Sequence, residues 1–89
     1  MVIYKQRLEI ADIQKITIPG DSQFLSLQAQ DNKPVLWYIV GADINKEFTL
    51  ITMTTGRNNG ERGKYLGTYQ LNGGAFVGHV FIKEEGILK

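Results

Sequence analysis

The feature that most constrains this chain is an alternation of apolar and polar residues with a period of two, interrupted at short intervals by turn-forming residues. Successive side chains of a β-strand point to opposite faces, so this period is typical of strands with one buried face. Ile, Val and Thr, whose β-branched side chains fit a pleated sheet, make up 21 of the 89 residues. The alternation predicts strands over residues 2–10, 13–18, 24–30, 35–40, 48–55, 65–71 and 75–83.

Turn-forming residues separate these segments. Residues 19–21, Pro-Gly-Asp, are typical of a type II turn, which takes Pro at its second position and Gly at its third. Residues 31–34 predict a four-residue hairpin loop. Residues 72–74, Asn-Gly-Gly, are the strongest hairpin signal, because Asn and Gly accept the positive φ that such turns require.

The alternation also predicts which face each side chain occupies. In the first strand, one face is expected to carry Tyr4, Leu8 and Ile10, and the other Lys5, Arg7 and Glu9. In the third strand, Leu25, Leu27 and Ala29 are expected to face the core, with the polar residues between them facing outward.

The segment 35–40 departs from this pattern because it is apolar on both faces. One face carries Val35, Trp37 and Ile39, and the other carries Leu36, Tyr38 and Val40. A strand of this kind either lies centrally between two layers or exposes one face to a partner.

Together these signals predict an all-β fold of about seven short antiparallel strands in meander order, closing as a small barrel or packing as a two-layer sandwich. The one competing helix covers residues 9–16, where Ile recurs at a spacing of three, but a convincing run of helix formers is missing there. The length predicts a single domain over residues 1–89.

Composition excludes several classes of protein. Ten Lys and Arg against nine Asp and Glu give a net charge of +1, and the absence of Cys excludes a disulfide scaffold and a thiol nucleophile. The longest apolar run, residues 35–40, is far shorter than the roughly 20 residues of a membrane-spanning helix. The first residues lack the features of a signal peptide, so we expect a cytoplasmic protein that inserts in no membrane.

His79 is the only histidine, which argues against His-rich metal sites and two-histidine mechanisms. We expect neither a metal ion nor another cofactor. His79 is interpreted as a hydrogen-bonded or partly exposed sheet residue. The alternative is a general base, with a Ser or Thr nucleophile across the sheet, as in a small hydrolase.

The segment 56–64 is locally basic in a nearly neutral chain. Its polar side chains include Arg57, Asn58, Asn59, Arg62 and Lys64, with Glu61 as the only acid. Glycines at 56, 60 and 63 would let backbone N–H groups approach an anion closely. The segment is either a solvated hairpin loop or a recognition loop for phosphate, a nucleotide or an acidic protein surface.

Aromatic residues form the third candidate feature. Trp37 and Tyr38 lie on the two-sided strand, and Tyr65 adds aromatic surface next to the basic segment. Core packing is one interpretation of Trp37, and a binding hot spot is the other, because Trp and Tyr are enriched in hot spots. Nucleic acid is an unfavourable partner, since a net charge of +1 gives weak attraction to phosphates.

The C-terminal third contains a distinctive motif that reads Tyr65-Leu66-Gly67-Thr68-Tyr69-Gln70-Leu71, then Gly73-Gly74, then His79-Val80-Phe81. This motif resembles the closing segment of a small uncharacterised domain family of bacteria and phages. Earlier motifs agree in order, so that the resemblance covers nearly the whole chain, although residues 56–63 are Gly- and Asn-rich where the family is often Pro-rich. Members are short stand-alone proteins of phages and prophages with no established activity.

The resemblance implies a phage accessory protein, and the residues suggest a non-enzymatic one that binds and blocks a host factor, such as an antiviral defence system. A protein inhibitor would use the outer face of the Trp37–Tyr38 strand or a sheet edge. A nucleotide sponge would hold its ligand between Arg57, Arg62 and Lys64, with a tyrosine stacked on the base, at the interface of a homo-oligomer. A hydrolase and a minor structural phage protein are the alternatives.

Overall fold

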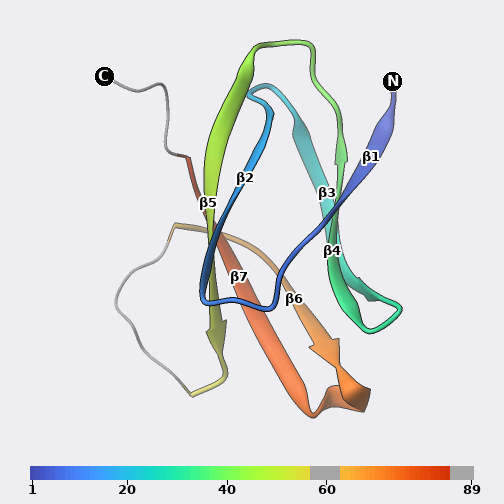
Figure 1. The fold of residues 1–89 in the computed structure, drawn as a ribbon, viewed down its shortest axis with the longest axis vertical. Helices are drawn as coiled ribbons and strands as arrows, with labels where there is room; N and C mark the ends of the chain where they lie inside the picture. Colours follow the sequence, from blue (N-terminus) through green and yellow to red (C-terminus); the bar gives the residue numbers. More distant parts are fainter. Residues whose placement is uncertain (57–62, 85–89) are drawn as a thin grey trace.

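The chain forms seven strands in two antiparallel sheets (Figure 1). The computed structural model describes residues 1–56 and 63–84, and all-β architecture, expected from the alternation, is confirmed. A single 3-10 turn, η1 (Asn72–Gly74), joins the last two strands. The strands are β1 (Ile3–Arg7), β2 (Ile13–Pro19), β3 (Gln23–Gln30), β4 (Lys33–Ile39), β5 (Asn45–Thr54), β6 (Lys64–Leu71) and β7 (Phe76–Glu84).

The strand order is not the predicted meander. A three-stranded sheet has the order β1-β4-β3, and a four-stranded sheet has the order β2-β5-β7-β6. Only the β3–β4 and β6–β7 pairs join strands that are consecutive in the chain. The prediction was wrong here because alternation defines the buried face of a strand but says nothing about its neighbours. The two sheets form an open sandwich rather than a closed barrel.

Strand β4 is central in the three-stranded sheet, with β1 and β3 on its two sides. Leu36 and Tyr38 face the core and are buried. Trp37 and Ile39, on the opposite face, are half-buried on the outside of the sandwich. The two-sided apolar pattern therefore reflects a strand that is central in its sheet and presents its second face outward.

The core lies between the sheets and receives side chains from every strand except β1. Leu36, Leu50 and Val80 are completely buried there. Burial of such apolar surface is the main stabilising contribution to a domain of this size. The core cluster consists of Leu8, Ile16, Ile18, Leu27, Leu36, Tyr38, Phe48, Leu50, Tyr69, Leu71, Val80 and Ile82.

The hairpin turns differ in how well the sequence predicted them. The turn at residues 72–74 is confirmed, with φ of 53° at Asn72 and 67° at Gly73. The predicted four-residue loop 31–34 is instead a two-residue turn, in which Asp31 and Asn32 have φ of 53° and 60°. Both residue types tolerate this left-handed conformation, so β4 begins at Lys33 and includes Pro34.

A β-bulge corrects the predicted orientation of β3. The register of β3 against β4 shifts between Phe24 and Ser26, so that Phe24 packs against the core while Leu25 is 45% exposed. A bulge inserts one unpaired residue and reverses the alternation beyond it. Leu27 is buried as predicted, whereas Ala29 is exposed near the end of the strand.

The first predicted strand ends earlier than the alternation indicated. Leu8 is buried, but its backbone N–H donates to the carbonyl of Pro34 outside the β1 ladder, and Ile10 is 57% exposed. Residues 8–12 cross from one sheet to the other, where Thr52 N–H donates to the carbonyl of Asp12. The competing helix over residues 9–16 does not form, because β2 begins at Ile13.

Candidate functional site

The described residues present three features that could support function: a hydrogen-bonded cluster around His79, an outer face around Trp37, and a hollow between β3 and β6. The first two lie on the outsides of different sheets. Within residues 1–56 and 63–84, no three His, Asp or Glu side chains are grouped to hold a metal ion, and no helix could span a membrane.

His79 joins three strands on the outer face of the four-stranded sheet. Its Nδ1 lies 3.0 Å from Oγ1 of Thr68, its cross-strand partner on β6, and its Nε2 lies 2.7 Å from Oγ1 of Thr55, just beyond β5. The Thr68 hydroxyl also bonds the Tyr65 hydroxyl. We call Thr55, Tyr65, Thr68 and His79 the imidazole cluster.

The cluster is a directional chain of hydrogen bonds. A neutral imidazole donates from one nitrogen and accepts at the other. If Thr55 donates to Nε2, then Nδ1–H donates to Thr68, whose hydroxyl donates to Tyr65; the other tautomer reverses every bond. Both nitrogens of His79 are satisfied by uncharged hydroxyls, and among the described residues no carboxylate bonds the cluster to favour one tautomer.

The surroundings of the cluster are aromatic. The rings of Tyr65 and Phe81, which pair across β6 and β7, meet edge to face with centroids 5.5 Å apart. Tyr65 is 55% exposed, so its ring is accessible as well as hydrogen-bonded. The structure thus brings two of the predicted site residues, Tyr65 and His79, into one cluster through Thr68.

Trp37 belongs to the outer face of the three-stranded sheet, which we call the tryptophan face. It pairs with Lys5 of β1 and Ser26 of β3. Tyr38 points the other way and is 5% exposed, with burial raising the pKa of its hydroxyl. Tyr38 therefore packs the core instead of offering a binding surface, and Trp37 is the aromatic side chain that β4 presents outward.

One hydrogen bond crosses the tryptophan face. Lys5 Nζ donates to Oε1 of Gln30 over 2.8 Å, which connects β1 to β3 across β4. Val35 lies on β4 beneath this crossing and is 1% exposed. The long stem of a lysine can cover apolar surface while its charge stays in solvent, which explains how Val35 is buried on an outer face.

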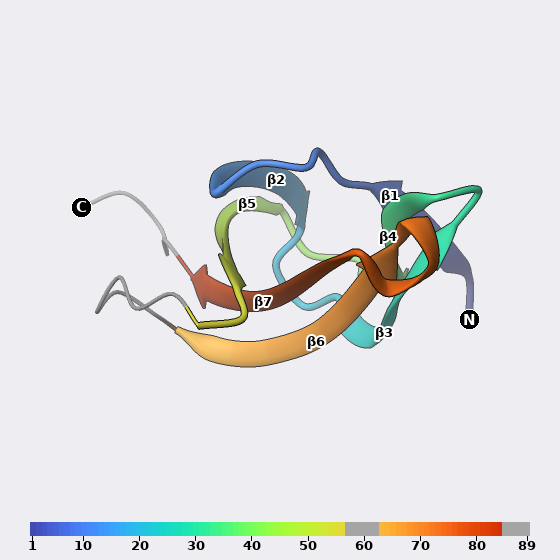
Figure 2. The same ribbon diagram turned by 90° about the horizontal axis from the view of Figure 1, so that it is seen from below.

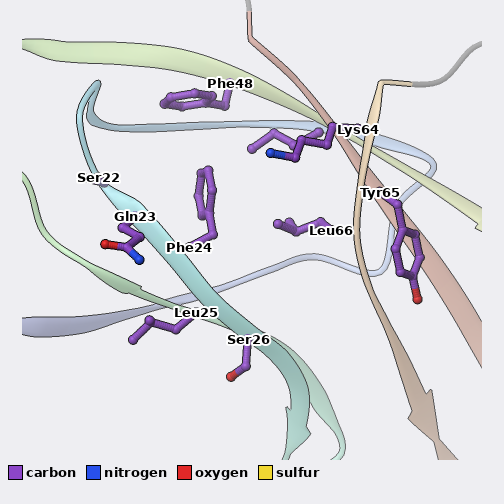
Figure 3. Close-up of a pocket in the computed structure, with 10 residues that line it drawn as sticks. Ser22, Gln23, Phe24, Leu25, Ser26, Phe48, Lys64, Tyr65 and Leu66 are labelled. Atoms are coloured by element: carbon purple, nitrogen blue, oxygen red, sulfur yellow. The ribbon is translucent and has the colours of Figure 1, made fainter.

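Strands β3 and β6, from different sheets, lie side by side (Figure 2). Side chains of both strands line a hollow at this junction of the sheets. It has a volume of about 580 Å³ and is lined by residues 22–26 and 64–66, with Phe48 and Ile82 beneath them. Figure 3 shows Phe24, Leu66 and the amine of Lys64 directed into it, while Tyr65 points away. Lys64 and Tyr65 are thus adjacent in the chain but serve different features. We call this space the β3–β6 hollow.

The remaining predicted binding residues, Arg57, Asn58, Asn59 and Arg62, lie outside the described residues. The glycines that flank them have structural roles. Gly56 adopts a φ of 90°, which a side chain rarely permits, and a Cβ on Gly63 would lie 2.1 Å from the carbonyl oxygen of Ile82.

Sequence reasoning missed Thr55 and Thr68 as partners of His79, although a partial signal was present for Thr68. The predicted hairpin at residues 72–74 joins the strands that carry Thr68 and His79. A three-residue turn would pair Leu71 with Ala75 and place Thr68 opposite Gly78, whereas the structure pairs Leu71 with Phe76 and Thr68 with His79. Thr55 had no such signal, because β5 pairs with β7 over a long separation in the chain.

These features define a small all-β sandwich whose polar and aromatic groups are carried on its outer faces and at one sheet junction. The chain belongs to the family described as Domain of unknown function (DUF7352), whose model matches residues 1–87. The expectation of a small uncharacterised domain family is therefore confirmed. No curated protein and no solved structure gives a significant match to the chain.

Proposed function

We propose that this chain is a non-enzymatic, phage-type accessory protein that binds a host protein through the tryptophan face and blocks it in the host cytoplasm. The observation that carries the proposal is the charge of the three-stranded sheet. Strands β1, β3 and β4 are fully described, and they contain Lys5, Arg7 and Lys33 but no Asp or Glu.

The three cations share the face of Trp37. Lys5 pairs with Trp37 itself, and Arg7 and Lys33 lie at positions of the same alternation, opposite Val35 and Gln30. Ile3, which pairs with Ile39, extends the apolar part and is 55% exposed. An apolar centre with an aromatic side chain and a charged rim is the usual composition of a protein-binding surface.

The charge of the rim indicates the chemistry of the partner. A surface with carboxylates around an apolar centre would be complementary, and complementary charges raise the rate of association. A second copy of this chain, docked through the same face, would instead bring cations together and be repelled. Nucleic acid is disfavoured, since the whole chain has a net charge of only +1.

The phage and host parts of the proposal are supported by the resemblance of residues 65–81 to the small phage family. Small phage proteins that lack a catalytic constellation are often inhibitors of host defence, and this context argument supports an inhibitor over a structural phage protein.

The test compares variants of the two outer faces. The tagged full chain captures its partner from a host lysate, the partner is identified and purified, and calorimetry measures its affinity for wild type, Trp37→Ala and Tyr65→Ala. We expect Trp37→Ala to weaken binding at least tenfold, Tyr65→Ala to leave it unchanged, and added salt to weaken it. Loss of binding with Tyr65→Ala alone would refute the proposal. It would also be refuted if the tagged chain captured a nucleotide from the lysate and no protein.

A second candidate function, hydrolysis, is favoured by one observation. Thr55 Oγ1 lies 2.7 Å from Nε2 of His79, within the distance at which a base activates a nucleophile. Thr68 occupies the place of the group that orients the base, but it is uncharged. Ester hydrolysis that is lost in both His79→Ala and Thr55→Val would support this candidate, and hydrolysis that persists in either variant would eliminate it.

A further inference from the structure

The β3–β6 hollow is bounded by two sheet edges. In the described residues, β3 forms a ladder with β4 alone and β6 with β7 alone, so the facing sides of β3 and β6 share no ladder. The two strands approach each other closely at Gly67, where a Cβ would lie 3.0 Å from Cβ of Leu27. This contact closes one end of the hollow.

The far ends of the two strands are held together by a pair of hydrogen bonds. Asn32 Nδ2 donates to Oδ1 of Asn72, and the Asn72 backbone N–H donates to Oδ1 of Asn32, each over 2.8 Å. Because the turns are joined in this way, β3 and β6 cannot separate easily along the half of their length beyond Gly67. The separation of the strands is confined to the other half.

Bulges occur in both strands at the hollow itself. The register shifts between Phe24 and Ser26 in β3 and between Tyr65 and Gly67 in β6. A bulge bends its strand, and bulges are enriched next to binding and active sites. The hollow of about 580 Å³ lies between the two bends and falls within the usual volume of small-molecule sites.

The lining has an apolar floor and one cation. Phe24 and Phe48 meet edge to face with centroids 5.8 Å apart, and Leu66 and Ile82 complete the floor. The Lys64 amine points into the hollow (Figure 3), and the described lining residues include no Asp or Glu. A ligand with an apolar body and a single negative charge would satisfy both parts.

We propose that the β3–β6 hollow binds a small amphipathic carboxylate, with its apolar body against Phe24, Phe48 and Leu66 and its carboxylate at Nζ of Lys64. Residues 64–66 of β6 offer about 10 Å of wall before Gly67, from a rise of about 3.3 Å per residue. This length suits a short chain of carbons rather than an extended peptide. The hollow adjoins the tryptophan face only at Ser26, which pairs with Trp37, and Phe24, Leu66 and Lys64 lie off that face, so either proposal can fail alone.

The probe is octanoate, titrated into the full-length protein labelled with 15N. We expect amide shifts at Phe24 and Leu66, and affinity that rises about fourfold for each methylene from hexanoate to octanoate. Lys64→Met should weaken octanoate binding about two- to fivefold without weakening the binding of 1-octanol. Lys15→Met, the same substitution on β2, outside both the hollow and the tryptophan face, should change neither affinity.

A second variant tests the position of the ligand. Leu66→Trp fills the hollow and should reduce octanoate affinity at least tenfold, with circular dichroism checking that the fold is kept. If that variant unfolds, the amide shifts and the Lys64→Met variant still show whether octanoate binds in the β3–β6 hollow. Octanoate binding that is unchanged in Lys64→Met, or amide shifts confined to residues outside the hollow, would overturn the proposal.

Discussion

The outer faces of the two sheets differ in how their polar and charged side chains are arranged. On the four-stranded sheet, polar side chains satisfy one another through the imidazole cluster and an ion pair of 3.5 Å between Lys15 and Glu47. On the three-stranded sheet, the strands provide cations without any carboxylate, around a half-buried Trp37. The net charge of +1 is therefore an average over one sheet whose strands carry only cations and another whose strands carry both signs.

This difference indicates which outer face is the better binding surface. Side chains that are hydrogen-bonded within their own face give up those bonds when a partner displaces them, which costs free energy. Charges of one sign around an apolar centre are complementary to an external surface instead. For this reason the tryptophan face, rather than the more elaborate imidazole cluster, is the basis of the proposed function.

The distinction between the two outer faces would fail if Trp37 contributed as much to the stability of the fold as Leu36, its neighbour in the core. Leu36→Ala removes a completely buried side chain of β4 and should lower the free energy of unfolding by about 2–5 kcal/mol. Trp37→Ala, on the outer side of the same strand, should cost only about 1 kcal/mol. Urea denaturation measures both. A loss for Trp37→Ala equal to that of Leu36→Ala would assign Trp37 to structure.

The imidazole cluster should matter more for stability than the hydrogen bond on the tryptophan face. Thr68→Val leaves Nδ1 of His79 without its partner and should lower the free energy of unfolding by about 1–2 kcal/mol. Gln30→Ala removes the exposed bond from Lys5 and should cost less than about 0.5 kcal/mol. Equal effects in thermal denaturation would show that the two faces are held together in the same way.

Inside the four-stranded sheet, one polar group lacks a partner. The Tyr69 hydroxyl is buried with no hydrogen bond among the described residues, and burial raises the pKa of this group. Tyr69→Phe removes it and should raise the free energy of unfolding by about 1 kcal/mol. Denaturation by urea detects this gain, and a clear loss of stability would mean that the hydroxyl has a partner in solution.

The smallest expected effect concerns the loops that join the sheets. The backbone N–H groups of Asp43 and Ala42 donate to the Asp21 carboxylate and lower the pKa of Asp21. A lowered folded-state pKa gives stability that is present above the ordinary pKa and lost as the pH falls through the folded value. Wild type should therefore exceed Asp21→Asn slightly at neutral pH and converge with it in acid, below about pH 4. A difference that grows in acid would contradict this.

The sequence predicted where the strands lie better than it predicted which strands pair with each other. Alternation identified the strands, and residues 72–74 identified the hairpin that joins β6 to β7 but not its register, because four residues and not three connect the two strands. The β1–β4 and β2–β5 pairs were not predictable, because they join distant segments whose alternation defines only a buried face. The bulge that exposes Leu25 likewise depends on a register set by the opposite strand.

Individual residues of the candidate sites could be predicted from the sequence, but their arrangement could not. Trp37 and His79 stood out as single residues of rare types, and the structure places them on different outer faces. The β3–β6 hollow has no signature in the sequence, because it arises where two strands from different sheets separate around paired bulges.

The central claim is that the tryptophan face is the binding surface, and hydrogen exchange in the complex with the purified partner tests it most directly. We predict that binding slows exchange in the amides of β1 and β4 around Lys5 and Trp37, and leaves Thr68 and His79 on the four-stranded sheet unchanged. Protection of β6 and β7 with no change in β1 and β4 would contradict the account and move the binding surface to the imidazole cluster.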